Sequence, residues 1–198
     1  MAWLEPVTLA GAVVTLEPLR PDHAGALADA AADGRLEELW YTSVPTRAGM
    51  AADVEAKLAE RDAGRMLPFV VRRSGTGAVV GMTTYCNADA ATPRLEIGHT
   101  WTAASAQRSG VNTESKLLLL THAFQVLGCV AVEFRTHWHN VASRTAIAAL
   151  GARQDGVLRN HRRLRDGSLR DTVVFSITEA EWPAVRNHLT HRLARHSG

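Results

Sequence analysis

The chain has 198 residues, of which 46% are hydrophobic and 21% are charged. This length can bury one sizeable core and is short for two, so we expect a single domain over residues 1–198, with its core from about 11 to 180. The formal net charge is only +2, because 22 basic residues face 20 acidic ones, and this near balance argues against a nucleic-acid partner. No run of eighteen apolar residues occurs, and no basic segment precedes an apolar run at the start, so we predict a cytoplasmic protein with no membrane partner.

The first third of the chain predicts one strand and two helices. Alternating apolar residues over 11–19 favour a strand that prolines end. Asp22 is placed to cap a helix over 23–32, and a second, amphipathic helix is expected over 51–61.

The middle of the chain predicts a meander of three strands. Residues 66–73 and 78–88 flank a glycine-containing turn, which is typical of an antiparallel hairpin, and residues 94–101 form the third strand. Alternation along this third strand puts two sets of residues on opposite faces, namely Leu95, Ile97 and His99 against Glu96, Gly98 and Thr100. Cys86 and Cys129 lie in apolar runs without the spacing of a metal or redox motif, so both are predicted to be reduced core residues.

The remaining chain alternates helices and strands. An apolar helix is expected over 113–127, then a strand over 129–138 and a short helix that Asn140 is suited to cap. Two strands joined by a turn at 166–167 and a C-terminal helix over about 179–196 complete the pattern. About seven strands with interspersed helices indicate a mixed α/β (α+β) fold with helices packed on the sheet.

The loop between the third strand and the apolar helix reads Gln107-Arg108-Ser109-Gly110-Val111-Asn112. The first four N–H groups of a helix lack internal partners and carry a partial positive charge, so they can bind an anion. Small side chains leave the backbone accessible here, and Arg108 adds a positive charge. The alternative interpretation is a plain structural loop, since any strand-to-helix connection can contain a glycine.

This loop resembles the phosphate-binding loop Gln/Arg-x-x-Gly-x-Gly/Ala of the GNAT superfamily of acyl-CoA-dependent N-acyltransferases, with Asn112 where that family has glycine or alanine. Four other stretches resemble, in the same order, the branch of the Rim-type ribosomal-protein N-terminal acetyltransferases: LEIGHTW, HAFQVLG, NVASRTAIAALGARQDGVLR and RDTVVFSITEAEWP. The resemblance covers nearly the whole chain.

The resemblance implies a GNAT fold, in which a mostly antiparallel sheet of about seven strands, with helices on both faces, splays into a V. It also implies acetyl-CoA as the acyl donor, with no metal, and a pantetheine arm that inserts into the V. The cofactor-binding residues that it implies are Gly98, Thr100, Trp101, Gln107, Arg108, Ser109, Gly110, Val111, Asn112, Thr113, Asn140 and Ser143.

The activity that the resemblance implies is an N-acetyltransferase in which a primary amine attacks the thioester directly. Glu96 is a candidate general base, or else a sheet residue paired with an arginine. Ser143 matches the serine that the branch places near the sulfur, or is an ordinary serine in the first turn of a helix. A tyrosine acid in that helix is excluded, because the only tyrosines are Tyr41 and Tyr85. The alternative function is a CoA-binding sensor without catalytic activity.

Candidate acceptor-binding residues are Trp40, Tyr41, His99 and His137. Trp40 and Tyr41 fall in a segment that covers the acceptor in this family, or else they pack in the core. His137 and His139 alternate on a strand, but two ligands without a third give poor support for a metal. The basic run 159–165 is either a solvated hairpin end or a contact for an acidic acceptor or the CoA 3'-phosphate. The acceptor could be a small-molecule amine or a protein N-terminus, and the C-terminal helix could pack on a second copy as a homodimer.

Overall fold

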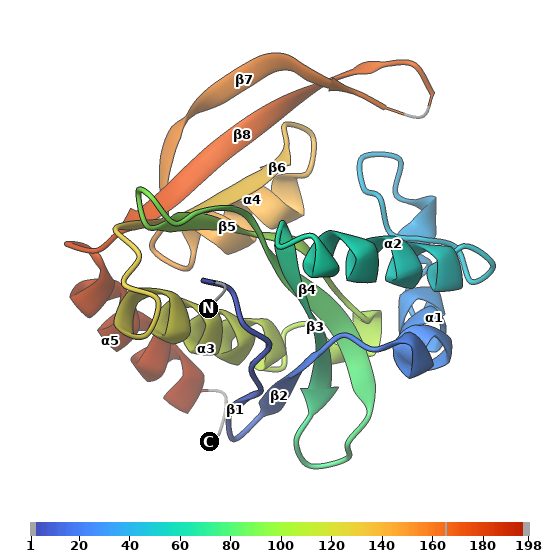
Figure 1. Cartoon of the computed structure of the whole chain (residues 1–198), viewed down its shortest axis with the longest axis horizontal. Coiled ribbons are helices and arrows are strands. Elements are labelled where there is room, and N and C mark those ends of the chain that lie inside the picture. The colour runs from blue at the N-terminus through green and yellow to red at the C-terminus, as the bar shows by residue number, and fades with distance from the viewer. Residues whose placement is uncertain (1–2, 165, 196–198) are drawn as a thin grey trace.

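The computed structural model describes residues 3–164 and 166–195 (Figure 1). One sheet has the strand order β1-β2-β3-β4-β5-β6-β8-β7, and β5 and β6 are its parallel neighbours. The strands are β1 (Leu9–Ala10), β2 (Val14–Pro18), β3 (Met66–Arg73), β4 (Val79–Asp89), β5 (Arg94–Thr102), β6 (Ala131–His137), β7 (Arg153–Arg163) and β8 (Leu169–Thr178). The helices are α1 (Ala24–Ala32), α2 (Met50–Asp62), α3 (Val111–Gln125), α4 (Val141–Ala148) and α5 (Trp182–Ala194), with short 3-10 turns η1 (Pro21–His23), η2 (Leu36–Glu38) and η3 (Ala104–Ala106). The predicted mixed, mostly antiparallel sheet is confirmed.

The sheet has eight strands where about seven were predicted, because a two-residue strand, β1, pairs with β2. So short a strand leaves no alternating pattern in the sequence. A tertiary contact holds its turn, since the carboxylate of Glu114 in α3 accepts hydrogen bonds from the N–H groups of Ala12, Val13 and Val14, at 3.0, 2.6 and 2.6 Å. A Cβ atom on Gly11 would lie 2.4 Å from the carboxyl carbon of Glu114, so only glycine fits there. This contact fixes the first turns of α3 against the edge of the sheet.

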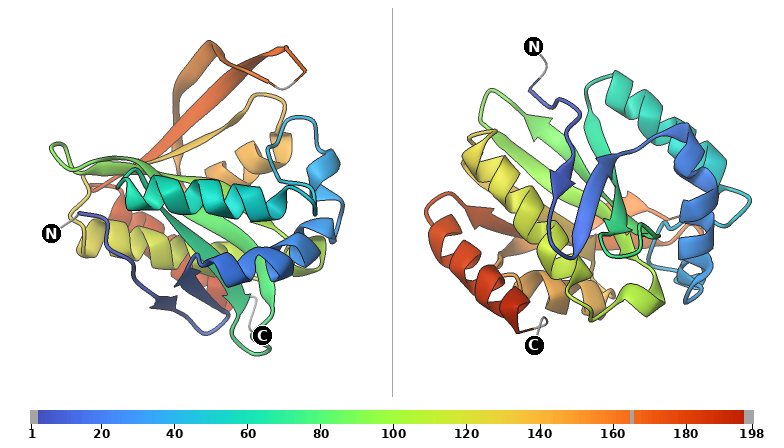
Figure 2. Two further views of the ribbon diagram at one scale, coloured as in Figure 1. Left: turned by 45° about the vertical axis from the view of Figure 1, so that its right-hand side comes forward. Right: turned by 90° about the horizontal axis from the view of Figure 1, so that it is seen from below.

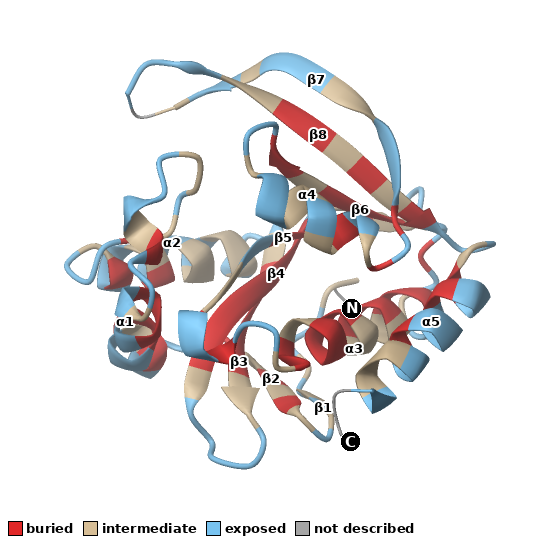
Figure 3. Ribbon diagram, turned by 180° about the vertical axis from the view of Figure 1, so that it is seen from behind, coloured by how far each residue is buried: buried red, intermediate tan, exposed pale blue. Residues whose placement is uncertain are grey.

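Helices cover both faces of the sheet, as predicted (Figure 2). Helices α1 and α2 pack on one face through a cluster that includes Leu19, Leu27, Met50, Val54, Val70 and Met82. Helices α3 and α5 pack on the other face, in a larger core that includes Leu95, Leu119, Leu120, Phe134, Trp182 and Leu189. Figure 3 shows how buried positions recur along the central strands and on the inner side of α3. The ring of Trp182 stacks on Phe124 at 5.3 Å, so the apolar side of α5 is used by the chain's own core.

The sheet splits between its two parallel strands. Strand β5 pairs with β6 only through its first three residues, Arg94 with Ala131, Leu95 with Val132 and Glu96 with Glu133. Beyond this point β5 remains paired with β4, while β6 continues along β8 as far as its last residue. Figure 1 shows β6, β8 and β7 rising away from β5. The splay into a V is therefore present.

A bulge in β5 overturns the predicted alternation of its side chains. Gly98 pairs with Thr84 and Trp101 pairs with Met82, so His99 and the residue after it oppose Thr83 alone. His99 has a positive φ of 48°. An inserted residue of this kind interrupts the two-residue period. The alternation therefore stops at the bulge. Thr100, predicted to share the face of Glu96, instead contacts Lys116 of α3, on the side where Leu95 and Ile97 pack.

Of the two predicted N-caps, Asp22 and Asn140, only Asn140 caps its helix. Asp22 does not cap α1, because its carboxylate receives a hydrogen bond from Arg20 at 3.1 Å and the turn η1 leads into the helix instead. Asn140 caps α4 as predicted, accepting a hydrogen bond from the N–H of Ser143 at 3.0 Å.

Candidate active site

A cavity of about 600 Å³ occupies the split between β5 and β6. We call one side of it the helix wall, formed by residues that precede or belong to α3, α4 and α5: Gln107, Arg108, Gly110, Asn112, Thr113, Lys116, Asn140, Ala142, Ser143, Ala146, Ile147, Leu150 and Arg192. We call the other side the loop wall, formed by the segment before α2, by α2 and by β8: Leu36, Leu39, Tyr41, Thr42, Ser43, Val44, Pro45, Lys57 and Arg170. Residues 97–102 of β5 and 134–137 of β6 lie between the two walls.

The helix wall presents a run of free backbone N–H groups. In the part of the chain that the structure describes, none of the six N–H groups from Arg108 to Thr113 has a hydrogen-bond acceptor, and the first helical bond of α3 runs from Glu114 N–H to Gly110 O at 2.9 Å. Gly110 has φ 81°, a left-handed conformation that glycine adopts without strain and that turns the chain into the helix. Six free donors at the positive end of a helix form an anion site that can take a diphosphate.

The side chains of the predicted loop divide into two groups. Those of Gln107, Arg108, Asn112 and Thr113 line the cavity, whereas Val111 is buried in the core. The hydroxyl of Ser109 donates to the carbonyl of Ala106 at 2.5 Å and does not line the cavity. Both the backbone of this loop and four of its side chains are therefore available to a ligand.

The start of α4 completes the helix wall. Asn140 and Ser143 both line the cavity, as do Gly98, Thr100 and Trp101 across from them. The carbonyl oxygen of the Asn140 side chain is used by the cap, which leaves its NH₂ group for a ligand.

Glu96 lies beside the cavity without lining it. The residue is 8% exposed, and burial raises the pKa of its carboxyl group above the ordinary value. Its Oε2 atom accepts a hydrogen bond from Asn87 at 2.7 Å and lies 3.6 Å from Arg135, so the arginine pairing considered from the sequence is present. The other oxygen, Oε1, has no donor among the described residues and would be 2.8 Å from a Cβ atom on Gly98. The missing side chain of Gly98 therefore brings this oxygen close to the cavity.

One buried lysine of the helix wall was not predicted from the sequence. Lys116 is 4% exposed, and its Nζ donates to the hydroxyls of Thr83 at 3.0 Å and Thr100 at 2.7 Å. Desolvation lowers the pKa of Lys116 to about 7. Its position three and four residues before Leu119 and Leu120 puts it on the buried face of α3, and this spacing was the available signal. The two hydroxyl contacts tie α3 to β4 and to the bulge of β5.

Four aromatic rings join the loop wall to the end of β6. The ring of Trp40 lies 5.6 Å from Tyr41, 5.1 Å from His137 and 5.7 Å from His139, and the two histidine rings lie 5.6 Å apart. Tyr41, His99 and His137 line the cavity, whereas Trp40 is 56% exposed and packs on His137 from outside. The four residues predicted to bind an acceptor thus lie in the cavity lining or, for Trp40, directly against it. Tyr85 is buried in the core, where its hydroxyl donates to the carbonyl of Leu119, and it does not line the cavity.

The arginines of the basic run 159–165 have different partners. Arg159 forms an ion pair with Asp171 at 2.5 Å, and Arg163 donates to the carbonyl of Gly167 at 2.8 Å. Arg165 lies outside the described residues. Within residues 3–164 and 166–195 there is no group of three or more His, Cys, Asp or Glu side chains that could hold a metal, and no helix there is long and apolar enough to span a membrane.

A sheet split between two parallel strands, with a diphosphate-sized run of free amides beside the split, defines an acyl-CoA-dependent N-acyltransferase. Residues 14–153 match the model of the acetyltransferase (GNAT) domain, and the chain belongs to this family. Members of the family use acetyl-CoA, and the free amides of the helix wall fit its pyrophosphate.

Solved structures agree with this assignment. A GCN5-related N-acetyltransferase from Brucella melitensis is 31% identical, with 96% of this chain and 86% of that chain covered and a TM-score of 0.83. RimJ of Mycobacterium smegmatis, in complex with CoA-disulfide, is 27% identical, with 94% and 95% covered and a TM-score of 0.80. Ribosomal-protein-S5-alanine acetyltransferase from Vibrio fischeri shares the fold at 15% identity, with 89% and 98% covered and a TM-score of 0.70. These neighbours support the predicted resemblance to the Rim-type branch, and no curated protein matches the sequence significantly.

Proposed function

We propose that the protein transfers the acetyl group of acetyl-CoA to a primary amine, which attacks the thioester directly without a covalent enzyme intermediate. The observation that carries this proposal is the run of free N–H groups from Arg108 to Thr113 beside the split between β5 and β6. A sheet interrupted at this point leaves unpaired peptide groups on the cavity side of β5, where the amides of a pantetheine arm can pair.

The helix wall would hold the acyl donor. The N–H groups of Arg108, Ser109, Gly110, Val111, Asn112 and Thr113 would bind the pyrophosphate, with Gln107 at the start of the loop. Gly98, Thr100 and Trp101 would lie along the pantetheine arm, and Asn140 and Ser143 would contact it from α4. When bound, this donor supplies a thioester carbonyl as the electrophile.

Glu96 would act as the general base. A primary amine must lose a proton on its way to the amide, and a carboxylate with a raised pKa is a suitable acceptor of that proton near neutral pH. The free Oε1 atom beside Gly98 supports this role, either directly or through one water molecule. The hydroxyl of Ser143, which lines the cavity, would donate a hydrogen bond or a proton to the departing sulfur.

Tyr41, His99 and His137, which line the cavity, would bind the acceptor, with Trp40 packed against His137. The resemblance to the Rim-type N-terminal acetyltransferases, which the similarity to RimJ supports, favours a protein N-terminus, and a small-molecule amine is the other acceptor class. The homodimer stays a prediction, although the apolar residues of α5 that suggested it are buried against α3.

A screen of amines with acetyl-CoA, with release of the free thiol as the readout, tests this function. The screen should include peptides with free and with blocked N-termini together with small amines. Thiol release that depends on a free amine, and a mass increase of one acetyl group on that amine, are expected. Tight CoA binding in calorimetry without turnover of any amine would instead identify the sensor, and no CoA binding would overturn the site.

A further inference from the structure

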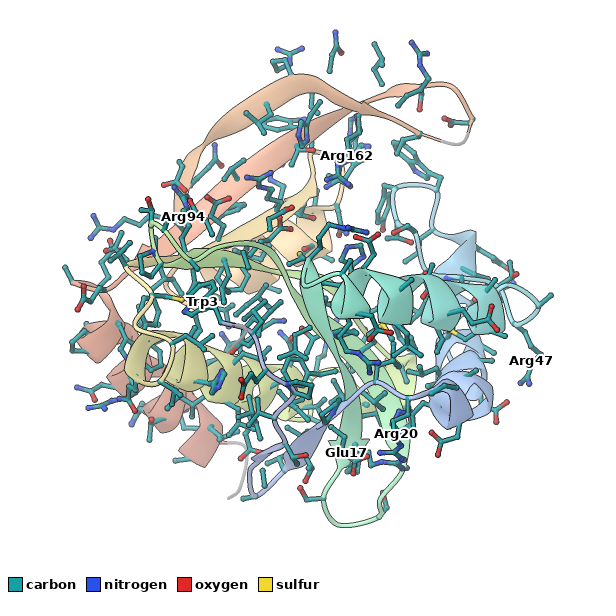
Figure 4. The ribbon with its side chains drawn as sticks, viewed as in Figure 1. Trp3, Glu17, Arg20, Arg47, Arg94 and Arg162 are labelled. Atoms are coloured by element: carbon teal, nitrogen blue, oxygen red, sulfur yellow. The ribbon has the colours of Figure 1, made fainter. Side chains whose placement is uncertain are left out.

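The acceptor end of the cavity has more positive charge than its carboxylates neutralise. The described carboxylates near this end already have basic partners. Glu96 and Glu133 pair with Arg135 and Arg94, Asp171 with Arg159, and Asp53 with Lys57. Arg162 and Arg170 face each other across β7 and β8, and neither has a carboxylate oxygen within 4.0 Å in the described chain. Figure 4 shows Arg162 on the inner side of the β7–β8 hairpin. Two adjacent guanidinium groups therefore lack a close carboxylate partner, and one of them, Arg170, lines the cavity.

Arg170 is the member of this pair that reaches the cavity. Its side chain lines the loop wall, and its Nε atom donates to the hydroxyl of Thr172 at 3.0 Å. That bond orients the guanidinium group and leaves its two terminal nitrogens without a hydrogen-bond acceptor among the described residues. Partial burial and the charge of Arg162 lower the pKa of Arg170, and the more distant charge of Glu96 offsets this only in part. A planar pair of free N–H donors is suited to bidentate binding of a carboxylate.

His137 supplies a second donor at the same end. It is 4% exposed, and its Nδ1 atom accepts a hydrogen bond from the N–H of His139 at 3.0 Å. Burial and the charge of Arg170 lower the pKa of His137, so the ring is neutral and its proton sits on Nε2. The Nε2 atom is buried and has no partner in the described residues, although the side chain lines the cavity. A buried donor without an acceptor is unfavourable unless a ligand supplies one.

We propose that the acceptor carries a carboxylate near its primary amine, and that Arg170 binds this carboxylate with the Nε2–H of His137 as a second donor. This inference rests on the proposed function and names the acceptor class of the same site. The carboxylate belongs either to a free amino acid or to an acidic first residue of a peptide, since both place it within a few bonds of the amine. Arg162 adds to the field without touching the ligand. Because the protonated Nε2 atom cannot accept a proton, His137 binds and orients the acceptor and does not act as the base.

Matched acceptors test the inference at saturating acetyl-CoA. The peptides Asp-Ala-Ala-amide and Asn-Ala-Ala-amide differ by one charge, and alanine and alaninamide form the corresponding pair of small amines. In at least one pair the acidic acceptor is expected to have a kcat/KM about tenfold or more higher, mainly through a lower KM, because one charge-assisted bidentate contact is gained. The pair that shows the preference identifies the source of the carboxylate.

Variants then assign the preference to Arg170. R170Q should abolish the preference while leaving the affinity for CoA unchanged, R170K should retain part of it, and H137F should reduce it. R153Q is the matched control, because Arg153 is 80% exposed on the same hairpin, pairs with Glu181 and does not line the cavity. Equal kcat/KM values for acidic and neutral acceptors, or a preference that survives in folded R170Q and R170K, would overturn the inference and leave the proposed function standing. Failure of the wild-type protein to turn over any amine would overturn the proposed function and this inference with it.

Discussion

The two walls of the cavity offer different kinds of contact to a ligand. The helix wall offers consecutive backbone N–H groups from one loop of the chain, between Arg108 and Thr113. The loop wall and the strands beside it offer side chains that come from distant segments, such as Tyr41 before α2, His137 in β6 and Arg170 in β8. A backbone site depends on a local conformation, whereas a side-chain site depends on how the whole chain folds. The first should tolerate most changes of side chain, and the second should not.

Lys116 connects the helix wall to strands β4 and β5. It belongs to α3, yet its contacts with Thr83 and Thr100 hold the bulge at His99. The helix that follows the free amides of residues 108–113 therefore also holds the bulge in β5.

The largest effect is expected at Glu96, which lies beside the cavity. Glu96→Gln removes the base without changing the shape of the side chain, so kcat should fall by about 100-fold or more. In the wild-type protein the rate should decrease as the pH falls through the raised pKa of Glu96, because only the ionised carboxyl group accepts a proton. Initial rates between pH 5.5 and 9 check this, and the variant should lose that acidic limb while its affinity for CoA stays the same. An unaltered pH profile would return Glu96 to a purely structural pairing with Arg135.

Asn112 gives the sharpest test of a wall that binds through its backbone. Asn112→Ala should change the affinity for CoA little, because the N–H group remains. Asn112→Glu places a negative charge beside the pyrophosphate, and at an effective dielectric constant near 20 this repulsion should weaken binding by about 100-fold. The same charge in the first turn of α3 should leave the thermal stability equal or slightly higher.

Titration calorimetry with CoA measures both Asn112 variants. A large loss of affinity in the alanine variant would contradict the contrast between the two walls, because it would mean that the side chain does the binding.

Trp40 tests the other wall. Trp40→Ala removes the ring that covers His137, so the KM for the acceptor should rise about tenfold while the affinity for CoA is unchanged. Because Trp40 is 56% exposed, the melting temperature should change little. Trp138→Ala is the matched control, since Trp138 lies outside the cavity and packs on Arg144. Equal effects of the two substitutions on the KM would remove Trp40 from the acceptor site.

The smallest effect is expected from the titration of Lys116. Its pKa is about 7 in the folded protein and near its ordinary value in the unfolded chain, so between these values the unfolded chain binds the extra proton. Stability should therefore rise with pH above 7, by about 1 kcal/mol between pH 7 and 8. Lys116→Met should lack this rise. Urea unfolding at several pH values measures it, and the same slope in both proteins would show that Lys116 keeps an ordinary pKa.

Most of the architecture, and the loop with the free N–H groups, could be predicted from the amino-acid sequence by itself. Local periodicity of apolar residues predicts most of the strands and helices. The loop from Gln107 to Asn112 is one contiguous segment, so its free N–H groups can be predicted from the residue at which α3 begins. Asn140 could be placed as a cap for the same reason.

Only the tertiary structure decided the rest. The strand β1 exists because Glu114 holds its turn from a hundred residues away, and the bulge at His99 depends on register against β4. The uncompensated charge of Arg170, the free Nε2 atom of His137 and the low pKa of Lys116 all arise from what surrounds these groups in space. Burial and unsatisfied hydrogen bonds are properties of packed neighbours, and a residue's neighbours in the folded chain are mostly not its neighbours in the sequence.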